Sequence, residues 1–262
     1  MVPPARYAPA MPTALITGAT AGIGAAFARR LASDGFDLVL LARDADRLER
    51  SAEAYRAEFG VRAEVLVADL ATDEGIAGAA RRCEDGVDLL VNNAGFGQRT
   101  DFLESDISAE LDMLKVHCEA VLRLTHAALP GMVARGRGGV VNVASVAAFF
   151  SRGTYSASKA WVVTFSDSIR QEAVGTGAHV MALCPGWVRT EFHQRSDMDT
   201  SAIPEFMWLS ADALVDAAIR DFRRGVAVSV PDVRYKALVG MGTLLPRSLV
   251  SRAAARAGSR HR

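Results

Sequence analysis

A tyrosine and a lysine four residues apart, Tyr155 and Lys159, are the side chains in this sequence best suited to acid–base chemistry. On a helix, residues at this spacing lie on the same face. A nearby ammonium favours phenolate over phenol, so we expect Lys159 to lower the pKa of Tyr155 from about 10. A tyrosine tuned in this way can exchange protons near neutral pH. The same spacing also occurs on ordinary solvated helices, so the pair needs support from the rest of the chain.

A serine hydroxyl is predicted to join this pair. Ser145 stands ten residues before Tyr155, at the end of the apolar run 139–144. A strand over that run would bring the hydroxyl to the edge of a sheet where the Tyr155 helix begins. The sequence therefore predicts three polar side chains at one sheet edge.

A glycine-rich turn lies near the start of the chain, between an apolar strand at 13–17 and an alanine-rich helix at about 22–34. Glycines in this setting let the backbone approach a pyrophosphate, and the helix N-terminus offers free N–H groups and a partial positive charge. The alternative is a tight turn with close helix packing. The turn residues expected to contact a nucleotide are Gly18, Thr20, Ala21, Gly22, Ile23 and Gly24.

The end of the second expected strand, 37–42, bears on the choice of cofactor. In a dinucleotide fold this end meets the adenosine ribose, where an acid would bind a free 2′-hydroxyl. Here Ala42 is neutral and Arg43 is cationic, which suits a 2′-phosphate and favours NADP over NAD. The alternative is a surface arginine paired with Asp44 or Asp46.

Strands and helices alternate along the chain, a pattern typical of a parallel, doubly wound sheet with helices on both faces. A long helix with Pro130-Gly131 near its end is expected to kink or stop there. The further elements expected are helices at 44–60, 72–84, 105–135 and 212–224, and strands at 63–68, 87–91, 178–183 and 226–230.

One domain is the simplest organisation, because no long repeat or interdomain linker interrupts residues 13–230. Residues 1–12 are expected to be a loose N-terminal extension and 231–262 a basic, solvated C-terminal extension. The segment at about 191–210 is apolar and follows a strand end. It is interpreted as a lid over a ligand, with core filling as the alternative.

Composition excludes several function classes. The 262 residues carry 30 basic and 30 acidic side chains, which argues against a general affinity for nucleic acid. No run is long and apolar enough to suggest a membrane span. Cys83, Cys118 and Cys184 have no metal-binding spacing and are interpreted as reduced residues of a cytoplasmic protein.

Six motifs, in order along residues 13–230, resemble the short-chain dehydrogenase/reductase family in its usual form. They are Thr17-Gly18-x-x-x-Gly22-x-Gly24, Asp69, Asn92-Asn93-Ala94-Gly95, Ser145, Tyr155-x-x-x-Lys159 and Pro185-Gly186-x-x-x-Thr190. Because six ordered motifs are far more specific than any one, the resemblance favours a functional interpretation of Tyr155 and Lys159. It implies a Rossmann-like α/β fold that binds NAD(P).

The resemblance also implies a role for each matching residue. Tyr155 would be the general acid or base, Ser145 would hold the substrate oxygen, and Lys159 would bind the nicotinamide ribose. The adenosine side of the cofactor would meet Asp69, Leu70, Asn93, Ala94 and Gly95. The nicotinamide side would meet Pro185, Gly186, Val188 and Thr190.

Two departures from the family pattern stand out. The connection 146–154 is shorter than usual, which suggests a trimmed wall of the substrate pocket. Where the family carries an asparagine in the long helix, this chain has His117. An imidazole with a pKa of about 6.5 would suit a pH-sensitive proton relay; the alternative is that His117 only packs within the helix.

The leading hypothesis is an NADP-dependent oxidoreductase that interconverts a carbonyl and an alcohol on a hydrophobic small molecule. The alternatives are a dehydratase or epimerase that retains its cofactor, and an NADP(H)-sensing protein without turnover. We expect a homodimer or homotetramer built on the long helix and the Tyr155 helix. We expect no metal, no nucleic acid and no firm membrane association.

Overall fold

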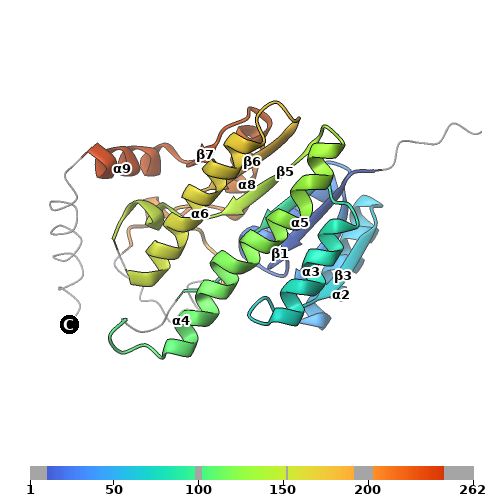
Figure 1. The fold of residues 1–262 in the computed structure, drawn as a ribbon, viewed down its shortest axis with the longest axis horizontal. Coiled ribbons are helices and arrows are strands. Elements are labelled where there is room, and N and C mark those ends of the chain that lie inside the picture. The colour runs from blue at the N-terminus through green and yellow to red at the C-terminus, as the bar shows by residue number, and fades with distance from the viewer. Residues whose placement is uncertain (1–10, 98–101, 152, 192–202, 245–262) are drawn as a thin grey trace, which may run out of the picture.

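The computed structural model of the protein describes residues 11–97, 102–151, 153–191 and 203–244. Its sheet has seven parallel strands in the order β3-β2-β1-β4-β5-β6-β7. The predicted doubly wound α/β fold is confirmed, with helices on both faces of one sheet in a single domain (Figure 1).

The elements follow the sequence patterns closely through most of the chain. The strands are β1 Thr13–Thr17, β2 Asp37–Ala42, β3 Ala63–Val67, β4 Leu89–Asn92, β5 Gly138–Val143, β6 Ala178–Leu183 and β7 Val228–Ser229. The helices are α1 Gly22–Ser33, α2 Ala45–Phe59, α3 Asp73–Glu84, α4 Ile107–Leu114, α5 Ala120–Ala134, α6 Gly153–Glu172, α8 Ala211–Arg223 and α9 Val233–Leu244.

Both faces of the sheet are apolar because successive strand residues point to opposite sides. Ile16 of β1 joins a core cluster covered by α1, α2 and α8, whereas its neighbour Leu15 joins a cluster covered by α3 and α5. Figure 1 shows α3, α5 and α6 side by side across this second face. The helix layers on the two faces together hold in place the edge of the sheet where the polar motifs lie.

The long helix is continuous through its proline. A π-helical segment, Lys115–Glu119, joins α4 to α5, and α5 continues through Pro130 to Ala134. The prediction that the helix could stop at Pro130 is therefore wrong. A π-helical turn is wider than an α-helical one and is frequent at functional sites; here it contains His117.

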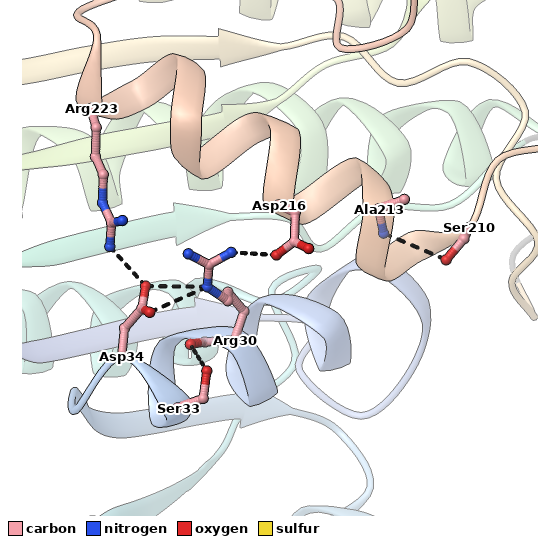
Figure 2. A network of polar contacts seen from close by, with 7 residues as sticks. All are labelled: Arg30, Ser33, Asp34, Ser210, Ala213, Asp216 and Arg223. Atoms are coloured by element: carbon pink, nitrogen blue, oxygen red, sulfur yellow. Dashed lines mark hydrogen bonds and ion pairs between the residues drawn. The ribbon is translucent and has the colours of Figure 1, made fainter.

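Ion pairs tie the end of α1 to α8, as Figure 2 shows. Arg30 contacts Asp34 on its own helix and Asp216 on α8, and Arg223 of α8 contacts the Asp34 carboxylate at 2.9 Å. These side chains are partly exposed, so each pair stabilises the fold only modestly. Together they hold α8 against α1, the helix of the glycine-rich turn.

The chain after Pro231 differs from the expected solvated extension. Residues 233–244 form α9, and Tyr235 on this helix is only 1% exposed. It belongs to a third core cluster with Ala144, Val162 and Cys184. The remaining parts of both expected extensions, 1–10 and 245–262, lie outside the described residues, as does 192–202 of the expected lid.

Candidate active site

The site lies where the strand order reverses. β1 pairs with β2 on one side and with β4 on the other, so the connections after β1 and β4 leave in opposite directions. Ligands of doubly wound sheets bind at such a point, outside the carboxyl ends of the strands. The glycine-rich turn follows β1 here and Asn93 follows β4.

The glycines of this turn are required by space and by backbone geometry. Gly18 has φ +67°, in the left-handed region. A Cβ at Gly24 would lie 2.2 Å from the Gly18 carbonyl oxygen and 2.5 Å from the Asn93 side-chain nitrogen. The turn therefore packs backbone against backbone, which is the close approach that a pyrophosphate cradle needs.

The N-terminus of α1 differs from those of α2, α3, α4 and α8. The caps Asp44, Thr72, Asp106 and Ser210 accept hydrogen bonds from the first turns of these four helices. α1 begins at Gly22, and its N-cap residue Ala21 provides no side-chain cap; its first turn has no acidic residue. The missing cap leaves the first N–H groups of α1 to bind an anion such as the pyrophosphate of a dinucleotide. The residues present thus fit such a cofactor.

Asn93 holds the turn from the neighbouring strand. Its side-chain amide donates to the Thr17 carbonyl at 2.8 Å, and its backbone N–H donates to the Thr17 hydroxyl at 2.9 Å. The Ala94 N–H donates to the same hydroxyl at 2.9 Å. Asn93 and Ala94 therefore tie the β4 end to the β1 end, a task that the sequence analysis did not assign to them.

Arg43 lies exposed just after the end of β2. Its guanidinium is 3.9 Å from the carboxylate of Asp69, with side-chain exposures of 76% and 42%. The partner is thus Asp69 rather than Asp44 or Asp46. Asp69 also accepts the Ala71 N–H, which orders the turn before α3. A long, exposed ion pair of this kind is worth little, so Arg43 is available to a stronger anion.

The predicted trio of Ser145, Tyr155 and Lys159 gathers at the ends of β5 and α6. Ser145 follows β5, and its hydroxyl accepts the Ala147 N–H at 3.1 Å. It also hydrogen-bonds the Tyr155 phenol. Tyr155 and Lys159 share one face of α6, with the lysine nitrogen 5.8 Å from the centre of the tyrosine ring. Side chains ten residues apart in the sequence thus meet where the strand ends and the helix begins.

Lys159 is almost completely buried. It is 5% exposed, and its ammonium donates to the Val143 carbonyl at 3.0 Å. A Cβ at Gly95 would lie 3.6 Å from the same nitrogen, so the loop after β4 passes close by. Burial lowers the pKa of Lys159 from 10.5 to about 8.

The expected lowering of the Tyr155 pKa is wrong. Burial raises the pKa of Tyr155 to about 12, and the hydrogen bond with Ser145 only partly opposes this rise. The physical reason is that desolvation disfavours the phenolate. The Lys159 ammonium meanwhile is directed to the Val143 carbonyl. Tyr155 is therefore a protonated phenol at neutral pH.

His117 is fully buried beside Tyr155 with both ring nitrogens in use. The Phe96 N–H donates to Nε2 at 3.1 Å, so Nδ1 carries the proton and donates to the Ser158 hydroxyl at 2.9 Å. Ser158 in turn donates to the Tyr155 carbonyl at 2.8 Å. Burial and the Lys159 charge lower the pKa of His117 well below 6.5. Of the two interpretations of His117, the pH-sensitive relay is therefore not supported, because His117 stays neutral near pH 7.

The segment after β6 closes the other side of the site. A Cβ at Gly22 would lie 2.9 Å from Thr190, so this segment touches the glycine-rich turn. Val188 is buried and forms an isolated parallel bridge with Leu209. Pro185 accepts the Val146 N–H at 2.9 Å, which joins the segment to the loop of Ser145.

Two sets of contacts near the site were not foreseen from the sequence. Behind the trio, Asn92 donates to Asn142 at 2.9 Å, and Asn142 donates to Ser166 at 3.0 Å, all fully buried. Beside the glycine-rich turn, Arg47 forms two hydrogen bonds with Glu191, at 2.8 and 3.1 Å. Polar residues inside apolar strands were the available signal for the first set; the second joins residues too distant in sequence to pair by pattern.

The described residues lack two other kinds of feature, a metal site and a membrane span. Over the ranges that the structure describes, no group of three or more histidine, cysteine or acidic side chains is arranged to hold a metal ion. Within the same ranges, no helix has the length and apolarity needed to cross a membrane.

Comparisons with known proteins agree with this geometry. A family model described as short chain dehydrogenase matches residues 12–201. The ketoacyl reductase HetN of Nostoc sp. is 34% identical over 67% of this chain and 63% of its own length. The sulfoacetaldehyde reductase of Chromohalobacter salexigens is 31% identical over 87% of this chain and 92% of its own.

Among solved structures, a short-chain dehydrogenase from Sphingobium yanoikuyae in complex with NADPH superposes with a TM-score of 0.82. It is 37% identical, and the match covers 88% of this chain and 93% of that one. The family model alone spans more than half of the chain. The chain therefore belongs to the short-chain dehydrogenase/reductase family of NAD(P)-dependent oxidoreductases.

Proposed function

We propose that the protein is an NADP-dependent reductase that converts a carbonyl group on a hydrophobic small molecule into an alcohol, and can run the reverse reaction. The observation that carries the proposal is the meeting of Ser145, Tyr155 and Lys159 beside a glycine-rich turn whose helix is uncapped. A proton donor and an anion cradle at one sheet edge suit hydride transfer to a carbonyl.

Each residue of the trio has one task in this proposal. Tyr155, protonated at neutral pH because its pKa is raised, donates its proton to the carbonyl oxygen. Ser145 hydrogen-bonds the same oxygen and holds it in place. Lys159 binds the ribose hydroxyls next to the nicotinamide. The cofactor, when bound, supplies the hydride.

The NADP preference rests on Arg43. Its side chain is exposed and weakly paired, and it follows a strand that ends in Ala42 instead of an acid. A guanidinium at this place can bind a 2′-phosphate with two charge-assisted hydrogen bonds. The NADPH complex of the relative from Sphingobium yanoikuyae supports the same choice.

The class of substrate is supported by the apolar side chains around the site. Phe149, Trp187, Met207 and Leu209 are partly buried hydrophobic residues packed against the third core cluster. These side chains belong to the segments that follow β5 and β6. A bulky hydrophobic carbonyl compound fits such surroundings better than a small charged one.

An assembly through α4, α5 and α6 is part of the proposal. Leu111, Leu114 and Leu122 on α4 and α5 are more than a third exposed, and so is Trp161 on α6, which stacks on Phe165 with ring centres 4.8 Å apart. Apolar side chains on adjacent helices favour burial in a homodimer or homotetramer. Light scattering at micromolar concentration checks the mass.

The function is tested by following NADPH absorbance while purified protein is offered ketones and aldehydes of increasing size. The proposal expects one equivalent of NADPH oxidised per alcohol formed, with faster turnover for bulky apolar carbonyls. Product formation without net NADPH consumption would instead indicate a dehydratase or epimerase that retains its cofactor. Tight NADPH binding with no turnover on any carbonyl would indicate a sensing protein.

A further inference from the structure

Among the described residues, Tyr235 on α9 is the largest side chain that is fully buried. It comes from a part of the chain beyond the residues matched by the family model, which end at 201. Its ring nevertheless reaches the segment after β6, which closes one side of the active site. A large buried side chain that links α9 to this segment calls for a functional explanation.

The ring lies directly against the backbone of Gly186. A Cβ at Gly186 would be 2.1 Å from the ring carbon that bears the hydroxyl, and 2.2 and 2.4 Å from the adjacent ring carbons. No side chain fits there while the tyrosine is present. The glycine of Pro185-Gly186 is therefore needed to receive Tyr235, a reason that has nothing to do with direct cofactor contact.

The phenol oxygen joins the stretches of chain at Trp187 and at Met207. It accepts the Trp187 N–H at 2.9 Å and donates to the Met207 carbonyl at 2.8 Å. The same two stretches are also joined by backbone bonds, from Leu209 N–H to the Trp187 carbonyl at 2.8 Å and from Arg189 N–H to the Leu209 carbonyl at 3.0 Å. Tyr235 thus completes the base of the loop between them.

The start of α9 is itself fixed. Asp232 accepts the Arg234 N–H at 2.9 Å and its guanidinium at 2.8 Å, and its carbonyl accepts the Lys236 N–H at 2.9 Å. Arg234 also donates to the Phe206 carbonyl. Because its helix start is held on both sides, Tyr235 presents its hydroxyl in one place.

We propose that Tyr235 is a positioning residue for the nicotinamide side of the site. The inference rests on the proposed function and on the family resemblance, which implies that Val188 and Thr190 face the nicotinamide end of the cofactor. The segment 186–190 is held by Tyr235 at one end and touches the glycine-rich turn through Thr190 at the other. Loss of the phenol hydroxyl leaves the Trp187 N–H and the Met207 carbonyl without this partner. The segment 186–190 is then no longer held at a fixed distance from the site.

The test compares two ligands on the Tyr235→Phe variant. NADPH has the nicotinamide and 2′-phospho-ADP-ribose lacks it, so the second ligand reports every cofactor contact except those of the nicotinamide ring. Because the segment beside the nicotinamide then lacks one of the hydrogen bonds that fix it, we expect NADPH affinity to fall by about fivefold or more. Affinity for 2′-phospho-ADP-ribose should remain within about twofold of wild type, which also shows that the variant is folded.

Tyr55→Phe is the matched control. Tyr55 is likewise buried, and its hydroxyl donates to the Ala25 carbonyl at 3.3 Å on the opposite face of the sheet. This variant should lose thermal stability without changing the ratio of the two affinities. If Tyr235→Phe weakens both ligands equally, or neither, the positioning role is overturned.

Turnover gives a second readout. With a carbonyl substrate, Tyr235→Phe should lower kcat, whereas Tyr55→Phe should not, even where their melting temperatures match. The ligand titrations need no substrate, so a failure to find a reducible carbonyl counts against the proposed function and leaves the test of Tyr235 intact. A kcat equal to that of wild type, together with an unchanged affinity ratio, would show that Tyr235 is core filling only.

Discussion

The Tyr155–Lys159 centre and the Arg43–Asp69 rim lie at the same edge of one sheet and use charge in opposite ways. Lys159 is 5% exposed, and burial lowers its pKa to about 8. The Arg43 side chain is 76% exposed, and its ion pair with Asp69 is long, at 3.9 Å. Burial in the centre changes proton affinity at a cost in stability, whereas the rim offers a charge to a ligand at almost no cost. Chemistry is expected from the first region and selectivity from the second.

The largest effect is expected from removing the proton donor of the centre. Tyr155→Phe should leave NADPH affinity nearly unchanged and reduce turnover at least a hundredfold, because general acid catalysis contributes about 10²–10⁴. Tyr55→Phe is again the control and should keep its turnover. Single-turnover kinetics with saturating NADPH measure the effect, and near-wild-type rates for Tyr155→Phe would remove the assigned role.

The next effect concerns the stability that the centre gives up to keep Lys159 buried. Since the pKa of Lys159 is about 8 in the folded protein and 10.5 as a free side chain, the unfolded chain binds the extra proton between these values. Stability from this group therefore rises as the pH rises from 8 toward 10.5.

Denaturation of wild type and Lys159→Met across this window isolates that contribution. The difference in their free energies of unfolding should shift by about 2 kcal/mol in favour of wild type between pH 7 and pH 10. Lys236→Met removes an exposed lysine of α9 and is the control for the loss of a lysine side chain. A difference that stays constant with pH for Lys159→Met would mean that this lysine is not desolvated.

At the rim, the expected effect is on cofactor choice alone. Charge-assisted contact with a phosphate is worth about 1.5–3 kcal/mol, so wild type should prefer NADPH over NADH by more than tenfold. Arg43→Ala should narrow this gap chiefly by weakening NADPH, and turnover at saturating cofactor should change little. Arg50→Ala removes an exposed charge from α2 and should preserve the gap. Equal dissociation constants in wild type would show that the rim does not select.

The smallest effect is expected at His117, which belongs to the centre by position but carries no charge there. His117→Ala removes the acceptor of the Phe96 N–H and one of the two partners of the Ser158 hydroxyl, and should lower the rate by about fivefold, whereas His117→Asn should recover part of it. Because the pKa of His117 is held well below 6.5, the pH–rate profiles of all three proteins should have the same shape from pH 6 to 8. A titration step that disappears with the histidine would restore the relay.

Local sequence patterns predicted the sheet, the glycine-rich turn and the meeting of Ser145 with Tyr155, because each depends on residues close together in the chain. The fold and family are confirmed, while the chemical role of each site residue stays a prediction. The pairing of Tyr155 with Lys159 was visible in the sequence, but the direction of the tyrosine pKa was not. Desolvation depends on what covers the phenol, and several distant segments do so.

Long-range contacts were beyond the same approach. Asn93 matched a family motif, yet its bonds to Thr17 join residues on two different strands and give it a task in holding the glycine-rich turn. Tyr235 fell within an expected solvated tail because the basic residues around it dominate the composition. Only the three-dimensional structure places its ring against Gly186.

The dependence of the loop base on Tyr235 has a consequence for synthesis of the protein on the ribosome. Strands β1 to β4 can pair before the second half of the chain has emerged, whereas the Trp187 and Met207 stretches receive their shared partner only when α9 is complete. The N-terminal part of a chain emerges first during synthesis. A nascent chain of this protein therefore exposes the residues of the glycine-rich turn early, and the Trp187 and Met207 stretches receive their shared partner last.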